Sequence, residues 1–170
     1  MKYLIYSKKT FQLKKNEVIQ ICKLKNSFWK FGLKSNLDWF RNKIKSNDIH
    51  NLIFANFKLI GYTVLKVNSL LKNKNKIKYF YLDTLIIDKK YRSNKFSSIL
   101  MHFNNQIILN NKKISFLICQ KQMVKFYKKF SWKLLNKKYF TIKDHKFSSY
   151  VMFFNNKFKT KTKYDIYLYR

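Results

Sequence analysis

Few side chains in this sequence can move protons at neutral pH. Its 170 residues hold seven acids and three histidines. One acid, Asp83, falls inside the apolar run 78–87, where the two-residue period of a strand places it on one face with Tyr81 and Leu85. A carboxylate in such a place either accepts a proton from a substrate or makes a structural hydrogen bond where a sheet opens, and both interpretations stay open.

The histidines and cysteines of the sequence do not form the pattern of a metal site. His50, His102 and His145 have no zinc-ligand spacing, and Cys22 and Cys119 supply neither that spacing nor a disulfide framework. Gly-x-Ser-x-Gly, Walker and Rossmann motifs are missing from the sequence. We therefore expect no metal.

A basic segment between a strand and a helix could bind an anion. The apolar strand end Leu85-Ile86-Ile87 is followed by Arg92-Ser93-Asn94-Lys95-Phe96-Ser97. A helix that starts directly after a strand points its free N–H groups and the positive end of its dipole at the carboxyl end of that strand. The alternative is an ordinary basic turn.

The hydrophobic pattern predicts the elements that would position these residues. They are a strand at 2–6, a helix at 16–25, a helix opened by a Ser35/Asp38 capping box, strands at 51–56, 58–67 and 78–87, a helix with an apolar stripe from Phe96 to Ile107, a strand at 114–118, a helix at 120–129, and strands near 131–135, 138–143 and 148–154. Asn56-Phe57-Lys58 reads as a hairpin turn. This order predicts a mixed sheet with helices on both faces. With no linker, residues 1–170 are expected to form a single domain.

Two segments within this order resemble motifs of the GNAT N-acetyltransferase family. Leu85–Ser97 resembles the strand-to-helix cofactor motif of that family, an apolar strand end followed by Arg-x-x-Gly-x-Gly/Ala. Phe126–Trp132 resembles its Phe-Tyr-x-x-x-Gly-Phe/Trp segment after the fifth strand. The surrounding elements match from about residue 50 to residue 154, and residues 1–49 agree in pattern only.

The chain departs from the family pattern at three positions that usually hold small residues. Lys95 and Ser97 stand where the phosphate loop usually has small residues, and Ser131 replaces a usual glycine. Glycine lets backbone amides approach a pyrophosphate without a clash at Cβ. A relative that no longer binds the cofactor is therefore the alternative interpretation, since a fold does not imply a function.

The resemblance implies an α/β (α+β) fold with a mixed, mostly antiparallel central sheet of six to seven strands and helices on both faces. It implies acetyl-CoA as co-substrate, with the pyrophosphate held by the amides of residues 92–97 and by the charges of Arg92 and Lys95. The pantetheine arm would lie along Leu85, Ile86 and Ile87, where a backbone N–H would face the thioester oxygen.

The resemblance also implies roles for three side chains. Asp83 would take the proton that the attacking amine must lose, and Tyr127 would donate a proton to the departing thiolate of CoA. Tyr127 also fits a plain apolar helix face. His145 falls where family members bind the acceptor, so it would position or deprotonate the acceptor amine.

The net charge of +31 favours anions without choosing among them. Our leading hypothesis is an N-acetyltransferase that acts on the primary amine of a small molecule, such as an amino sugar or a nucleotide-linked amino sugar, by direct attack in a ternary complex. The alternatives are a protein or antibiotic N-acetyltransferase and a non-catalytic basic nucleic-acid-binding module on the same scaffold. Trp29 and Trp39, set among basic residues, could stack on bases, but more often such residues form helix faces that pack on a sheet.

The location follows from hydropathy and cysteine content. No apolar run approaches the roughly 20 residues that span a bilayer, and the apolar start of the chain is too short for a signal peptide. Two cysteines without a disulfide framework suit a reducing compartment. We expect a cytoplasmic protein without membrane insertion, with nucleic acid a disfavoured partner and a homodimer left open.

Overall fold

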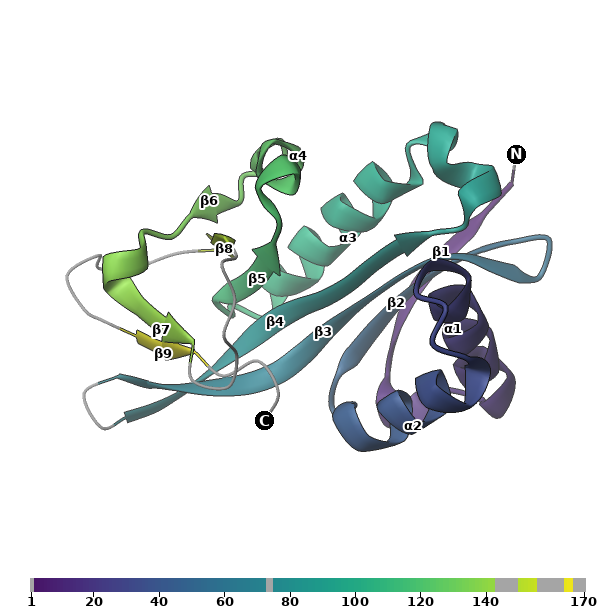
Figure 1. Cartoon of the computed structure of the whole chain (residues 1–170), viewed down its shortest axis with the longest axis horizontal. Coiled ribbons are helices and arrows are strands. Elements are labelled where there is room, and N and C mark those ends of the chain that lie inside the picture. Colours follow the sequence, from purple (N-terminus) through teal and green to yellow (C-terminus); the bar gives the residue numbers. More distant parts are fainter. Residues whose placement is uncertain (1, 73–74, 143–149, 156–163, 167–170) are drawn as a thin grey trace. The chain divides into compact units, whose positions relative to one another are not determined.

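A computed structural model describes residues 2–72, 75–142, 150–155 and 164–166 (Figure 1). Its elements in chain order are β1 (Leu4–Lys9), η1 (Thr10–Gln12), α1 (Lys15–Phe28), α2 (Leu33–Lys43), β2 (Ile49–Ala55), β3 (Lys58–Lys72), β4 (Asn75–Ile87), η2 (Lys89–Asn94), α3 (Phe96–Asn110), β5 (Ser115–Cys119), η3 (Lys121–Met123), α4 (Val124–Lys128), β6 (Lys133–Leu134), η4 (Lys137–Tyr139), β7 (Phe140–Ile142), β8 (Tyr150–Phe154) and β9 (Tyr164–Ile166).

The strands form a mixed sheet in which antiparallel pairs predominate. The strand order is β1-β2-β3-β4-β5-β8-β6, and β9 pairs with β3 and β7. β4 runs parallel to β5 and β7 runs parallel to β9, whereas the pairs β1–β2, β2–β3, β3–β9, β5–β8 and β6–β8 are antiparallel. The predicted mixed, mostly antiparallel sheet is confirmed.

The chain divides into two compact units, and β3 and β4 contribute residues to both. The first unit comprises residues 1–66 with 83–104, and the second comprises residues 67–82 with 105–170. Among the residues that the structure describes, no helix combines the length and the apolar character of a bilayer-spanning segment.

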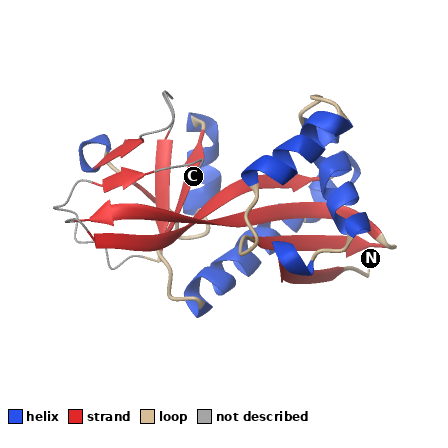
Figure 2. Cartoon of the chain, turned by 90° about the horizontal axis from the view of Figure 1, so that it is seen from below, coloured by secondary structure: helices blue, strands red, loops and turns tan. Residues whose placement is uncertain are grey.

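In the first unit, helices cover both faces of the strands (Figure 2). Alternate residues of β2 point to opposite faces, so Leu52 packs with α1 and α2 while Ile53 packs with α3. The face toward α1 and α2 buries Ile21, Cys22, Leu24, Phe40, Leu52, Leu59, Tyr62, Val64 and Ile86. The face toward α3 buries Ile53, Ala55, Ile60, Ile87, Phe96 and Leu100.

The second unit has its own core between β4, β5 and β8. The core buries Leu70, Tyr79, Tyr81, Phe116, Leu135, Val151 and Phe153. The predicted helix at 120–129 is shorter, because Lys121–Met123 forms a 3-10 turn before α4. β9 was not predicted from the sequence; it is a three-residue strand, too short for a hydrophobic period.

The predicted capping box of the second helix is wrong. α2 begins at Leu33, and its N-cap is Gly32 with φ 88°, a conformation that glycine adopts without strain. Ser35 therefore lies inside the first turn of the helix. Asp38 instead makes an exposed ion pair with Arg41, with an N–O distance of 3.5 Å.

Left-handed backbone occurs mostly without glycine in this chain. The described non-glycine residues with positive φ are Asn56, Phe57, Thr84, Lys95, Lys112, Ser131 and Asn155. Asn56 and Phe57 form the predicted turn between β2 and β3. Each such residue costs about 1–2 kcal/mol relative to a right-handed conformation, with asparagine at the low end.

A nearly buried carboxylate joins α1 to β1. Glu17 accepts hydrogen bonds of 2.7 Å from the Tyr6 hydroxyl, from the Lys8 ammonium and from the backbone N–H of Lys14. Burial alone would raise the pKa of Glu17, but the bonds from Lys8, Lys14 and Tyr6 outweigh it and lower the pKa below its ordinary value of 4.5.

We expect Glu17→Gln to lower the free energy of unfolding at pH 7 by about 1.5–3 kcal/mol, since it removes charge-assisted hydrogen bonds from a buried acceptor. A lowered carboxyl pKa stabilises the fold above the unfolded-state pKa, and this stabilisation is lost as the pH falls through the folded-state pKa. The difference from wild type should therefore shrink below about pH 4.5. Urea unfolding at several pH values measures this difference.

Asp38→Asn, in the exposed pair with Arg41, is the control and should lower the free energy of unfolding by about 0.5 kcal/mol or less. A pH-independent cost for Glu17→Gln would contradict the assignment.

Candidate functional site

Strand β4 contains one residue more than its two neighbours can pair. The N–H of Phe80 donates to Ile114 on the β5 side, at 2.9 Å, and the N–H of Asp88 donates to Ile60 of β3, at 2.8 Å. Residues separated by an even number along a regular strand point their N–H groups to the same edge, so these two bonds require an irregularity between them. Thr84 supplies it with φ 60°, an uncommon conformation for a β-branched residue.

The predicted pantetheine-binding residues follow this bulge. The described ladder between β4 and β5 consists of Phe80 with Ser115 and Tyr81 with Phe116. Leu85, Ile86 and Ile87 lie beyond those pairs. Since Asp88 points its N–H at β3, the alternation of the strand turns the N–H groups of Leu85 and Ile87 to the opposite edge.

The phosphate-loop residues form a 3-10 turn, a left-handed residue and then a helix. Asp88 caps η2 by accepting from the N–H of Lys90 at 3.0 Å, and it pairs with Lys58 at 2.7 Å. Arg92 is exposed, its Nε donates to the carbonyl of Ile87 at 3.3 Å, and its guanidinium carbon lies 5.4 Å from the ring centroid of Phe28.

Lys95 and Ser131 stand at positions where the family usually has a small residue or glycine, and both adopt the left-handed backbone that glycine favours. Lys95 has φ 58° and ψ 15°, and Ser131 has φ 64°. The carbonyl of Lys95 accepts from the N–H groups of Ser98 and Ile99. The N–H groups of Phe96 and Ser97, the first residues of α3, precede Ser98, which is the first N–H donor to the Lys95 carbonyl. An anion site at a helix N-terminus uses N–H groups in this position.

Asp83 lies in a cluster of charged and hydroxyl groups within the first unit. Its Oδ2 is 3.5 Å from Nζ of Lys66, whose residue is 3% exposed, and its Oδ1 accepts from the Thr84 hydroxyl at 3.3 Å. Thr84 in turn accepts from Nζ of Lys25 at 3.4 Å. The bulge thus brings one carboxylate together with two buried ammonium groups.

The sequence analysis did not identify Lys25. This residue is 7% exposed, and its Nζ lies 3.4 Å from the ring centroid of Trp39 and 4.9 Å from that of Trp29. Burial lowers its pKa to about 8, against opposing contributions from Asp83 and Cys22. A signal existed, because Lys25 follows the buried residues Ile21 and Cys22 at helical spacing and so falls on the apolar stripe of α1.

Tyr127 and His145 are the two other side chains for which the sequence predicted a catalytic role. Tyr127 belongs to the second unit, where it is 9% exposed on α4. Burial, with a smaller contribution from Cys119, raises the pKa of its hydroxyl, which therefore keeps its proton at neutral pH. His145 lies outside the described residues.

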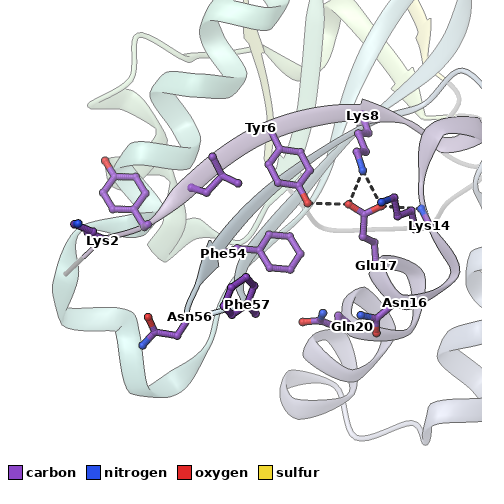
Figure 3. Close-up of a pocket in the computed structure, with 12 residues that line it drawn as sticks. Lys2, Tyr6, Lys8, Lys14, Asn16, Glu17, Gln20, Phe54, Asn56 and Phe57 are labelled. Atoms are coloured by element: carbon purple, nitrogen blue, oxygen red, sulfur yellow. Dashed lines mark hydrogen bonds and ion pairs between the residues drawn. The ribbon is translucent and has the colours of Figure 1, made fainter.

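A hollow on the first unit lies apart from the residues above. A cavity of about 680 Å³ is lined by β1, the start of α1 and the β2–β3 turn, with the Tyr6–Glu17–Lys8 group on its wall (Figure 3). None of the predicted site residues lines it. A neighbouring cavity of about 510 Å³ reaches Asp88. Within the described ranges, no three His, Cys, Asp or Glu side chains gather as metal ligands would.

Comparison by sequence finds no family model and no curated protein that matches this chain. Comparison by structure finds similar proteins that cover most of it. ElaA of Escherichia coli superposes with a TM-score of 0.65 at 13% identity, covering 89% of this chain and 98% of its own. The PaiA N-acetyltransferase of Thermoplasma acidophilum, solved with coenzyme A, gives a TM-score of 0.59 at 18% identity, covering 90% and 98%.

An aminoglycoside 6'-N-acetyltransferase, also solved with coenzyme A, gives a TM-score of 0.63 at 11% identity, covering 87% of this chain and 94% of its own. At such identities the likeness concerns the fold. The chain has the fold of the GNAT N-acetyltransferases, as its two motifs predicted.

Proposed function

We propose that this protein is an acetyl-CoA-dependent N-acetyltransferase that transfers an acetyl group to a primary amine of a small molecule by direct attack in a ternary complex. The observation that carries the proposal is the connection from β4 to α3 on this fold. There the bulged strand is followed by the 3-10 turn η2 and by the left-handed Lys95, after which the 15-residue helix α3 begins. Two proteins of similar fold were solved with coenzyme A.

The β4–α3 connection suits a pyrophosphate. The N–H groups of Phe96 and Ser97 precede the first intrahelical N–H donor, Ser98, and the helix dipole adds positive potential. Arg92 and Lys95 are exposed beside them. Lys95 keeps the left-handed turn and adds a charge that glycine lacks, so the substitution is compatible with phosphate binding.

The reaction needs a neutral amine, a stabilised oxyanion and a protonated leaving group. Asp83 receives the amine proton, and the Thr84 hydroxyl bonded to it fixes the direction of that carboxylate. A backbone N–H on the free edge of Leu85–Ile87 donates to the thioester oxygen as it becomes negative. Tyr127, whose raised pKa keeps it protonated, donates to the CoA thiolate. His145 positions or deprotonates the acceptor.

The proposed acceptor class is an amino sugar or a nucleotide-linked amino sugar. A net charge of +31 favours an acceptor that carries phosphate. A panel of amino sugars, nucleotide-linked amino sugars, aminoglycosides and peptides tests this class. Transfer to peptide N-termini or lysines alone would replace it with a protein acetyltransferase.

The first prediction for this site concerns cofactor binding. By calorimetry, we expect acetyl-CoA to bind with a micromolar Kd and more tightly than ATP, because the pantetheine arm adds contacts along β4. Arg92→Ala should weaken acetyl-CoA binding about tenfold, as the loss of one charge-assisted contact would. The matched control is Lys9→Ala, which removes a positive charge far from the start of α3 and should leave the Kd for acetyl-CoA unchanged. Tyr3 contacts Phe96 at the start of α3, with ring centroids 5.3 Å apart, and Lys9 lies six residues, or about 20 Å, further along, at the end of β1.

No binding, or binding equalled by ATP, would contradict the proposal. The non-catalytic basic module would then lead, and it predicts RNA or DNA binding whose affinity falls steeply with salt.

The second prediction concerns the leaving group. Tyr127→Phe should lower kcat for the best amine of the panel by about 10²-fold, because general-acid catalysis contributes at least that much. The Kd for acetyl-CoA should stay within about twofold, since no hydroxyl contact to the bound cofactor is needed. Tyr139→Phe, a partly buried tyrosine of the second unit, is the control and should keep wild-type kcat. An unchanged kcat in Tyr127→Phe would remove Tyr127 from the acid role.

A further inference from the structure

The Nζ of Lys25 lies beside the bulge at which the proposed function places the thioester. It is 3.4 Å from the hydroxyl of Thr84, and Thr84 is followed directly by Leu85, whose N–H turns to the cofactor edge. Consecutive Cα atoms are about 3.8 Å apart. An amine nitrogen of the protein itself therefore contacts the residue next to Leu85, to whose edge the proposed function assigns the thioester.

We propose that Lys25 is itself an acyl acceptor, so that in the absence of an amine substrate the protein transfers the acetyl group of its bound acetyl-CoA to Nζ of Lys25. This inference rests on the proposed function, because it needs acetyl-CoA at the β4–α3 site. It adds a modification site to that function, and the modified group is an internal primary amine rather than a diffusing one.

Two tryptophans hold this amine in place. Trp39 of α2 and Trp29 at the end of α1 contact Nζ, and Lys25 is only 7% exposed. The side chain has thus lost most of its rotational freedom in the folded protein. A nucleophile fixed next to a bound electrophile reacts at an effective concentration far above that of free amines, provided the geometry is near the attack geometry.

The surroundings also favour the reactive form of the amine. Lys25 faces Asp83 on β4 and Lys66 on β3, with Cys22 on its own helix. Burial lowers its pKa to about 8, Asp83 and Cys22 oppose the shift, and Lys66 adds to it. Near neutral pH a larger fraction of the molecules therefore carries a neutral Lys25 than would carry a neutral exposed lysine.

The chemical step balances with acetyl-CoA as the only co-reactant. The lone pair of neutral Nζ attacks the thioester carbonyl carbon, a C–N bond forms, and the C–S bond breaks. The nitrogen releases one proton, and the departing thiolate takes up one, so the products are Nε-acetyl-lysine and CoA. The charge of Lys25 is removed, and with it the cation–π contact to Trp39.

The test incubates the purified full chain with micromolar acetyl-CoA and follows intact mass and peptide maps over time. We expect one acetyl group per chain, mapped to Lys25, at a rate that saturates with acetyl-CoA and does not depend on protein concentration. The rate should rise with pH and level off above about pH 8, as neutral Lys25 becomes the main form. S-acetyl-N-acetylcysteamine, a thioester without the nucleotide, should label Lys25 at least tenfold more slowly at equal concentration.

Two variants separate Lys25 from general lysine reactivity. Lys25→Arg keeps a cation over Trp39 but cannot accept the acetyl group, so the single labelling event should disappear. Lys23→Arg, an exposed residue of the same helix, should label as wild type does. If Lys25→Arg does not fold, the peptide map of the wild-type chain still decides.

The outcomes distinguish this inference from the function beneath it. Calorimetric binding of acetyl-CoA, or transfer to an added amine, with Lys25 unlabelled would overturn the inference and leave the function standing. Labelling spread over exposed lysines, or equally fast with the small thioester, would reduce it to uncatalysed chemistry. Absence of acetyl-CoA binding would overturn both.

Discussion

The extra residue in β4 is the constraint on which the proposed chemistry depends. A strand that paired regularly with both neighbours would leave no backbone N–H for a ligand. Thr84, at φ 60°, shifts the alternation, so the N–H of Phe80 before it points to the β5 side whereas that of Asp88, an even number of residues later, points to β3. The same residue carries the hydroxyl that links Lys25 to Asp83. One strained conformation therefore exposes backbone and gathers side chains at a single point.

Charge in this protein is arranged differently inside and outside. Its 38 basic residues are spread along the whole chain, and water screens those that lie on the surface. Lys25 and Lys66 are buried beside a single carboxylate, Asp83, so the cluster holds more potential positive than negative charge. Such a cluster becomes less costly when one amine is neutral or when an anion approaches. An acyl-CoA and its developing oxyanion would satisfy that condition.

The sequence predicted the fold well where hydrophobic period and motif agreed. The β2–β3 hairpin, β4, α3 and β5 lie where apolar spacing placed them, and Lys95 and Ser131 adopt the left-handed backbone that glycine favours. The roles of Asp83, Tyr127 and His145 stay predictions. The sequence could not show that α2 starts at a glycine cap, because Ser35 and Asp38 offered a competing local signal. It also could not show that Lys25 reaches Thr84, which is a contact across 59 residues.

The left-handed Lys95 has a consequence for how relatives of this protein are recognised. A pattern that demands glycine at this turn describes the residue that adopts the conformation most easily, not the conformation itself. Here a lysine adopts left-handed backbone, at a strain of about 1–2 kcal/mol. In lineages whose codon usage disfavours glycine, the backbone angle can therefore persist after its usual amino acid has been lost. Comparison of structures will therefore detect such relatives after comparison of sequences no longer does.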